Sequence, residues 1–491
     1  MSIQKGGTLI RRIRFLSMSI SLPKIIQGGM GVGVSNWRLA QAVSRIGQMG
    51  VVSGTGLDQV LARRLQDGDL EGHCRRALEH FPFPHMAKRV LDMFFIPGGK
   101  QPEMPYKVTA PAVIKNHHWL DEIYIVANFV EVFLAREGHS NPVGINYLEK
   151  IQLPHLPSVY GAMLAGVAVV IMGAGIPVNI PSALDLLSRH EAATYPIHVT
   201  GATPETDCQR VFDPAAFIEG ATPPPLKRPV FLPIISSDSL ATMLLRRSGG
   251  VIDGFVIEGP TAGGHNAPPR GPMHLTEDGQ PIYGPRDVVK LDALRKIGLP
   301  FWLAGAYGSA ARLREALDAG ASGIQVGTAF ALCAESGMEP QFRHALLKKA
   351  LAGKARVMTD PVASPTGFPF KVAQLEGTLS EPEVFTQRRK ICNIGYLREP
   401  YLKADGRVGF RCPSEPAEAF LAKGGKLEDT VGRKCICNGL FANIGLGQIL
   451  PGGRREPGIV TLGDDVVNVG QFCKGGNIDY TAADVVRIIL G

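Results

Sequence analysis

The 491-residue chain has little cysteine and no long run of one charge. Its eight cysteines include no C-x-x-C pair, which excludes a disulfide framework, because such scaffolds are short and cysteine-dense. No Lys/Arg run interleaves with aromatic residues, so nucleic-acid binding is not expected. The net charge of +8 is compatible with anionic ligands such as phosphates.

Charge is absent altogether from residues 151–183, a stretch longer than the roughly 20 residues of a membrane-spanning helix. Four prolines interrupt it, and "VAVVIMGAGIP" is more typical of a buried parallel strand with its loop, so no membrane span is predicted. The basic N-terminus is predicted to be an irregular arm (1–22) rather than a secretory signal, because no small-residue cleavage site follows it. The expected location is the cytoplasm.

Short apolar runs recur along the chain; several of them end in glycine-rich loops, and most precede a helical pattern. Eight such runs occupy 23–31, 50–56, 143–149, 167–175, 229–237, 253–265, 300–308 and 322–328. Continuous β-branched runs indicate strands buried on both faces. Eight strand–helix units predict an α/β fold of the (β/α)8 barrel type over 23–354. A doubly wound dinucleotide fold is disfavoured, because "GGMGVG" lacks the acidic residue expected some 20 residues later.

Two insertions and one extension interrupt this rhythm. Residues 67–140 separate the second and third strands, and residues 190–228 separate the fourth and fifth. Beyond residue 354 the alternation stops. Residues 355–491 are therefore predicted to be a C-terminal extension that either covers the barrel mouth or makes an oligomer contact.

Barrel enzymes place their active sites at the carboxyl ends of the strands, and here these ends are rich in small residues. The loops after strands seven and eight commonly bind phosphate. In "AGAYGS" and "GT", Gly305, Ala306 and Gly308 offer backbone amides and Thr328 a hydroxyl. A phosphate site is predicted there, with tight turns and helix caps as the alternative.

His265 follows the sixth strand in "EGPTAGGH". An imidazole above the barrel axis can accept or donate a proton near neutral pH, and Gly263 and Gly264 permit a close approach to a flat ring. His265 is thus the catalytic candidate, with a solvated loop histidine as the alternative.

Five cysteines gather near the C-terminus: Cys392, Cys412, Cys435, Cys437 and Cys473. The C-x-C spacing is unusual for zinc, so reduced and mostly buried thiols are expected and no metal site is predicted. An iron–sulfur or other metal site in this extension stays open as the alternative.

The motifs "IIQGGMGVGVSNWRLAQAVSRIGQMGVVSG", "VGIN", "MGAG.P", "EGPTAGGH" and "LAGAYGSAARLREALDAGASGIQVGT" together resemble the nitronate monooxygenase (2-nitropropane dioxygenase) family. That family includes flavin enoyl-acyl carrier protein reductases and the reductases of polyunsaturated fatty acid synthases. The resemblance covers roughly 23–350 and implies a barrel that binds FMN, with His265 as a proton-transfer residue. Arg270 is the candidate substrate-binding residue if the chain reduces enoyl thioesters. The implied cofactor-binding residues are Gln27, Gly28, Gly29, Met30, Asn146, Gly173, Gly175, Gly263, Gly264, Gly305, Gly308, Gln325, Gly327 and Thr328.

The resemblance implies an FMN-dependent oxidoreductase that oxidises alkyl nitronates with oxygen. The first alternative is an NAD(P)H-dependent reductase of enoyl thioesters, and the second is a non-catalytic, flavin-bound subunit of a lipid-synthesis assembly. A homodimer or a synthase partner fits these readings. Thr261 and "NAPPRG" replace an acid and a glycine that flank "AGGH" in enoyl reductases, and this departure leaves the substrate open.

Overall fold

The computed structural model describes residues 22–115, 118–203, 206, 208–221, 223–450, 452–475 and 477–491. The predicted N-terminal arm lies outside the described residues except for Leu22. Among the described residues, no helix has both the length and the apolar character that a bilayer crossing requires.

Eight parallel strands form the centre of the molecule, as the sequence predicts. They are β1 (Ile25–Gln27), β2 (Gly50–Ser53), β3 (Val143–Leu148), β4 (Val169–Gly173), β7 (Val230–Ile235), β8 (Phe255–Glu258), β9 (Phe301–Ala304) and β10 (Gly323–Val326). Their spatial order is β1-β10-β9-β8-β7-β4-β3-β2. A parallel bridge between Ile26 and Met49 joins the two ends of this order, so the sheet closes into the predicted barrel.

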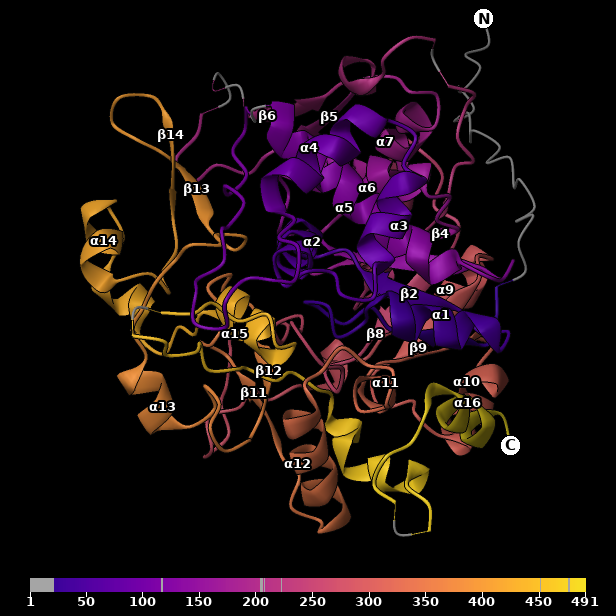
Figure 1. Cartoon of the computed structure of the whole chain (residues 1–491). Coiled ribbons are helices and arrows are strands. Elements are labelled where there is room, and N and C mark those ends of the chain that lie inside the picture. Colours follow the sequence, from indigo (N-terminus) through magenta and orange to yellow (C-terminus); the bar gives the residue numbers. More distant parts are fainter. Residues whose placement is uncertain are drawn as a thin grey trace, which may run out of the picture.

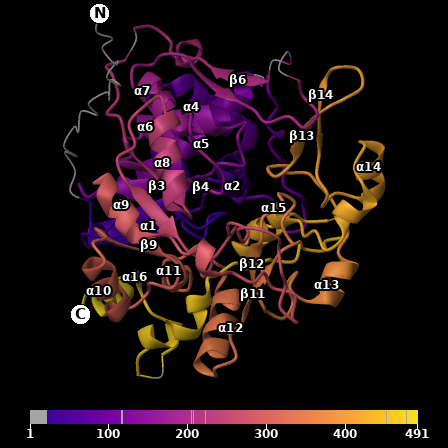
Figure 2. The same cartoon turned by 180° about the vertical axis from the view of Figure 1, so that it is seen from behind.

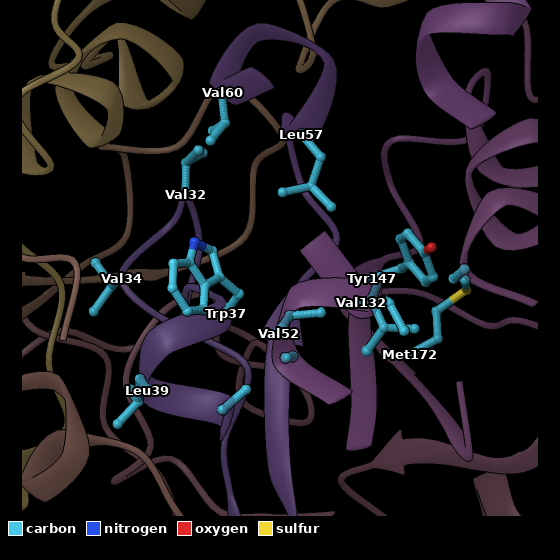
Figure 3. Close-up of a cluster of buried hydrophobic side chains, with 14 of the residues drawn as sticks. Val32, Val34, Trp37, Leu39, Val52, Leu57, Val60, Val132, Tyr147 and Met172 are labelled. Atoms are coloured by element: carbon cyan, nitrogen blue, oxygen red, sulfur yellow. The ribbon is translucent and has the colours of Figure 1, made fainter. Parts of the chain in front are cut away.

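The alternation of side chains along these strands produces two cores. Inward-facing residues form a separate buried cluster inside the barrel, with Ile26, Val51, Ile171, Leu232 and Trp302 among its members. Residues of opposite orientation, such as Val52 and Met172, pack outward against the helices (Figure 3). Since both strand faces are buried, continuous apolar runs are what the fold requires.

The helices that follow the strands cover the barrel. These are α1 (Trp37–Arg45), α2 (Leu57–Gln66), α6 (His155–Leu164), α7 (Ile180–Leu187), α8 (Asp238–Arg247), α9 (Leu291–Ile297), α10 (Ala310–Asp318), α11 (Thr328–Ala331) and α12 (Pro340–Leu351), with a short 3-10 turn η2 (Pro285–Asp287) before α9. Several begin with side-chain caps, such as Asn36 on α1 and Ser309 on α10. Such caps satisfy amides that a helix start leaves unpaired.

The two insertions are compact additions to the barrel. The first contains α3 (His73–Glu79), α4 (Pro84–Phe94) and α5 (His118–Arg136), and α5 packs on α6 and α2. The second contains the antiparallel pair β5 (Ala193–Pro196) and β6 (Gln209–Phe212), followed by η1 (Pro214–Phe217).

The C-terminal extension wraps along one side of the barrel, where its orange and yellow segments lie in Figures 1 and 2. Its elements are β11 (Val357–Asp360), β12 (Phe370–Ala373), α13 (Pro382–Gln387), β13 (Glu399–Leu402), β14 (Val408–Arg411), α14 (Ala417–Ala422), η3 (Leu427–Thr430), α15 (Ile436–Asn443), η4 (Asp464–Phe472) and α16 (Ala482–Leu490). The final helix, α16, returns to pack against α1 and α10.

Candidate active site

The carboxyl ends of all eight barrel strands open onto one cavity of about 1420 Å³, including its opening to solvent. Glycines and other small residues from these ends form most of its floor. The extension supplies the facing wall, which consists of Phe370, Tyr396, Leu397, Ile436, Cys437, Leu440, Thr461, Leu462, Gly463 and Asp465. The extension therefore takes part in building the site.

The loop after β1 brings Gly28, Gly29 and Met30 into the cavity, as predicted. Gln27 does not line it. Its side chain is fully buried behind the loop, where it donates to Ser35 Oγ (2.8 Å) and accepts from Val51 N (3.0 Å). Ser35 Oγ also accepts from Met30 N (2.8 Å). Gln27 and Ser35 thus hold the shape of the glycine loop from behind.

Asn146 and Gln325 also lie in the cavity. A Cβ added at Gly29 would come within 2.2 Å of the Asn146 Cβ, so only glycine lets these two strand ends meet. Gln325 Oε1 is buried and has no hydrogen-bond partner among the described residues. A buried acceptor without a partner is costly, and a ligand that donates an N–H from the cavity would satisfy it.

The predicted phosphate loops face the same cavity through Gly305, Ala306, Gly308, Gly327 and Thr328. Gly305 and Ala306 both have left-handed backbone conformations, with φ of +94° and +57°.

Two polar groups of these loops contact the extension. Gly308 N donates to the carboxylate of Asp465 (3.1 Å), and Thr328 Oγ1 accepts from Gly463 N (2.9 Å). The backbone amide of Gly308 is therefore already bonded to the side chain of Asp465 in this structure. A phosphate at this position would share or replace that contact.

A second cavity, of about 1040 Å³, lies beside the first. The two share Ala174, Ile234, Glu258 and His265. Among the predicted residues, Gly173 lines only the first, whereas Gly175 and Arg270 line only the second. His265 and Glu258 stand at the boundary between the two spaces.

His265 lies in the first cavity with Gly263 and Gly264, as predicted. One ring nitrogen, Nε2, is 2.7 Å from Ser364 Oγ, and the ring packs edge-on against Phe370 at 4.8 Å. Burial, with a smaller effect of the positive charge of Lys150, lowers the pKa of His265 to about 4. The imidazole is therefore neutral at physiological pH and able to accept a proton.

The extension fixes the His265 loop through its backbone. Gly264 N donates to Thr461 Oγ1 (2.8 Å), and Gly264 O accepts from Lys371 N (2.9 Å). Asn266 N donates to Pro369 O (2.9 Å) on the other side of the histidine. Contacts on both sides of His265 hold it in one position, which is what proton transfer to a bound ligand requires.

Replacement of Thr461 with valine is expected to lower kcat, because it removes the acceptor of the Gly264 N–H and frees the histidine loop. Loss of such a hydrogen bond costs about 1–3 kcal/mol. Steady-state kinetics and thermal unfolding measure the two effects. Thr461→Ser keeps the hydroxyl and should retain both properties, and equal losses in the two variants would contradict this role.

Glu258, the last residue of β8, is a candidate that the sequence analysis missed although it lies in the quoted motif. It lines both cavities. Burial raises its pKa to about 8, so the carboxyl group keeps its proton at neutral pH. Its position at the end of a barrel strand is the signal that could have identified it. The wall residues of the extension had no comparable signal.

The donor set of the cavity fits a flavin. A flat ring system with polar and apolar edges matches the glycine-lined floor, the unpartnered Gln325 oxygen and the apolar wall of Leu397, Ile436 and Leu440. Two adjoining residues in left-handed conformation, Gly305 and Ala306, suit an anionic tail.

Comparison with known proteins finds a family that is similar to the second half of this barrel. Residues 227–363 match the family described as nitronate monooxygenase. The matched region includes Glu258, His265 and both predicted phosphate loops, so the resemblance drawn from the motifs is confirmed.

A nitronate monooxygenase of Pseudomonas aeruginosa is 38% identical over 117 residues, which are 24% of this chain and 32% of that protein. The match thus spans about a third of the length of this relative.

Two solved structures are similar in arrangement. FabK from Thermotoga maritima has 15% identity and a TM-score of 0.45, covering 95% of this chain and 91% of its own. A nitroalkane oxidase from Streptomyces ansochromogenes has 15% identity and a TM-score of 0.46, covering 95% and 94%. The barrel assignment rests on the strand order described above.

Proposed function

We propose that the chain is an FMN-dependent oxidoreductase that oxidises alkyl nitronates, with oxygen as the electron acceptor. The observation that carries this proposal is the neutral, rigidly held His265 in the cavity at the strand ends. The family match over residues 227–363 supports it.

FMN would lie on the glycine floor, with Gly28, Gly29, Met30 and Gly173 against the ring. Asn146 and Gln325 would bind its polar edge. Gly305, Gly308, Gly327 and Thr328 would hold the phosphate, and Gly263 and Gly264 would allow a close approach from the other side. When bound, the flavin supplies electron transfer that no side chain can provide.

His265 would accept the α-proton of a nitroalkane substrate, or would orient the nitro oxygens of the nitronate by a hydrogen bond. Its low pKa keeps it neutral for either task. Glu258, protonated at neutral pH, would donate a hydrogen bond to substrate oxygen from the neighbouring strand end. A neutral base and a neutral acid in one cavity match the needs of general acid–base catalysis.

A second candidate function, reduction of enoyl thioesters with NAD(P)H as donor, is favoured by the second cavity. This cavity adjoins the first at His265 and contains apolar residues such as Ile176, Ile235 and Leu240 beside Arg270. A small nitronate does not need such space, whereas a long acyl chain does. Arg270 would then bind the phosphate of an acyl carrier or of the nicotinamide donor.

Anaerobic mixing with NADPH separates the two functions. As a nitronate monooxygenase, the flavin-loaded protein should keep its oxidised absorbance with NADPH and consume oxygen when an alkyl nitronate is added in air. Rapid bleaching by NADPH would instead support the enoyl reductase. A flavin that responds to neither reagent would contradict both enzymatic proposals and leave the non-catalytic, assembly-bound role.

A further inference from the structure

Four cysteines of the extension surround one small cavity. Cys392, Cys412, Cys435 and Cys437 come from three separate segments of the chain and line a space of about 300 Å³. The sequence alone favours scattered buried thiols here. Convergence of four thiols on one cavity is the arrangement in which proteins hold metal through sulfur.

The four sulfurs line a cavity and do not converge on a single metal-ion position. Within the described part of the chain, no group of three or more Cys, His, Asp or Glu side chains is arranged to hold a single metal ion. A tetrahedral zinc site needs four sulfurs about 2.3 Å from one centre. A polynuclear cluster instead occupies the space between its cysteines, so the cavity fits a cluster better than an ion.

Positive charge borders the sulfurs. Arg398 lines the cavity together with the four thiols. Arg388, whose side chain is 3% exposed, lies near Cys435 and pairs with Glu456. Its Nη2 has no hydrogen-bond partner among the described residues. Arg398 would offset part of the negative charge of a thiolate-ligated cluster, whereas the charge of Arg388 is already paired with Glu456.

We propose that Cys392, Cys412, Cys435 and Cys437 bind an iron–sulfur cluster. Each thiol releases its proton as its sulfur forms a bond to iron. The partial exposure of Cys392 gives the cavity access to solvent. Leu397, Ile436 and Cys437 line both this cavity and the large cavity at the barrel mouth, so the cluster would lie directly behind the wall of the proposed flavin site.

The test is iron and acid-labile sulfide analysis of the full chain, purified without oxygen and reconstituted with ferrous iron and sulfide. The wild type should contain iron and sulfide in a ratio near one, at about two to four irons per chain, and should give a low-temperature EPR signal after dithionite reduction. Cys412→Ser should lose most of both. Cys473→Ser, outside the cavity, should keep them.

Flavin content and thermal unfolding, measured on the same samples, separate a lost cluster from a lost fold. The proposal is overturned if the reconstituted wild type contains no iron, or contains zinc in place of iron and sulfide. It is also overturned if Cys412→Ser retains the cluster at the wild-type level. The flavin content is independent of these outcomes, so failure here leaves the proposed oxidoreductase intact.

Discussion

His265→Ala is expected to lower kcat/KM for the alkyl nitronate substrate by about 10²–10⁴-fold, the range typical of the loss of a general base. The neutral imidazole lies at the boundary of the two cavities and is the proton acceptor that we propose. Ser364 and the backbone contacts at Gly264 and Asn266 hold it in place. Removal should therefore affect the chemical step more than flavin binding.

Steady-state kinetics with matched flavin content measures this loss. His274→Ala is the control, because His274 is an exposed histidine a short distance further along the chain and should keep wild-type turnover. An unaltered kcat/KM in His265→Ala would remove the histidine from the mechanism. A loss explained wholly by missing flavin would make His265 a binding residue.

Glu258→Gln is expected to abolish the high-pH limb of the activity profile. The carboxyl has a pKa of about 8 in the folded chain, so it is protonated at pH 7 and ionises above pH 8. Wild-type kcat/KM should then fall about tenfold for each further pH unit. Glutamine keeps a hydrogen-bond donor but cannot ionise, so its activity should stay flat through this range.

The same shift predicts a stability effect. The folded pKa of Glu258 is raised above the ordinary value of 4.5, so between these pH values the unfolded chain releases a proton that the folded chain keeps. Glu258 therefore destabilises the fold increasingly as pH rises from 4.5 to 8. Glu258→Gln should gain in Tm over the wild type on going from about pH 5 to about pH 8.

Glu277→Gln, at an exposed site, is the control for both measurements and should resemble the wild type. If the activity of Glu258→Gln still falls above pH 8, the ionisation responsible belongs to another group. A difference in Tm that does not change with pH would contradict the burial of a neutral carboxyl at the end of β8.

The barrel could be predicted from the sequence because its signals are local. The parallel strands are buried on both faces and most end in glycines, and the strand–helix pattern recurs eight times. The His265 loop was recognisable because its glycines and histidine are adjacent in the chain. The facing wall of the cavity was not, since Phe370, Tyr396 and Thr461 reach it through long-range folding of the extension.

The same limit applies to the raised pKa of Glu258, although not to its place at a strand end, and to the convergence of the late cysteines. The special property of Glu258 is a raised pKa, which depends on burial and not on its neighbours in the chain. The four thiols converge from segments whose spacing matches no familiar ligand motif. For Gln27 the sequence predicts a contact that the structure does not show. It is expected against the flavin ring, but its buried side chain supports the glycine loop through Ser35 and Val51.

The flavin content of the purified chain tests the central claim most directly. The protein should carry, or take up from added FMN, about one FMN per chain, released on denaturation and identified by chromatography against FMN and FAD. Gly29→Leu should bind little, because its side chain would collide with Asn146. A correctly folded wild type that neither contains flavin nor binds added FMN would contradict the assignment of the cavity and of every role proposed within it.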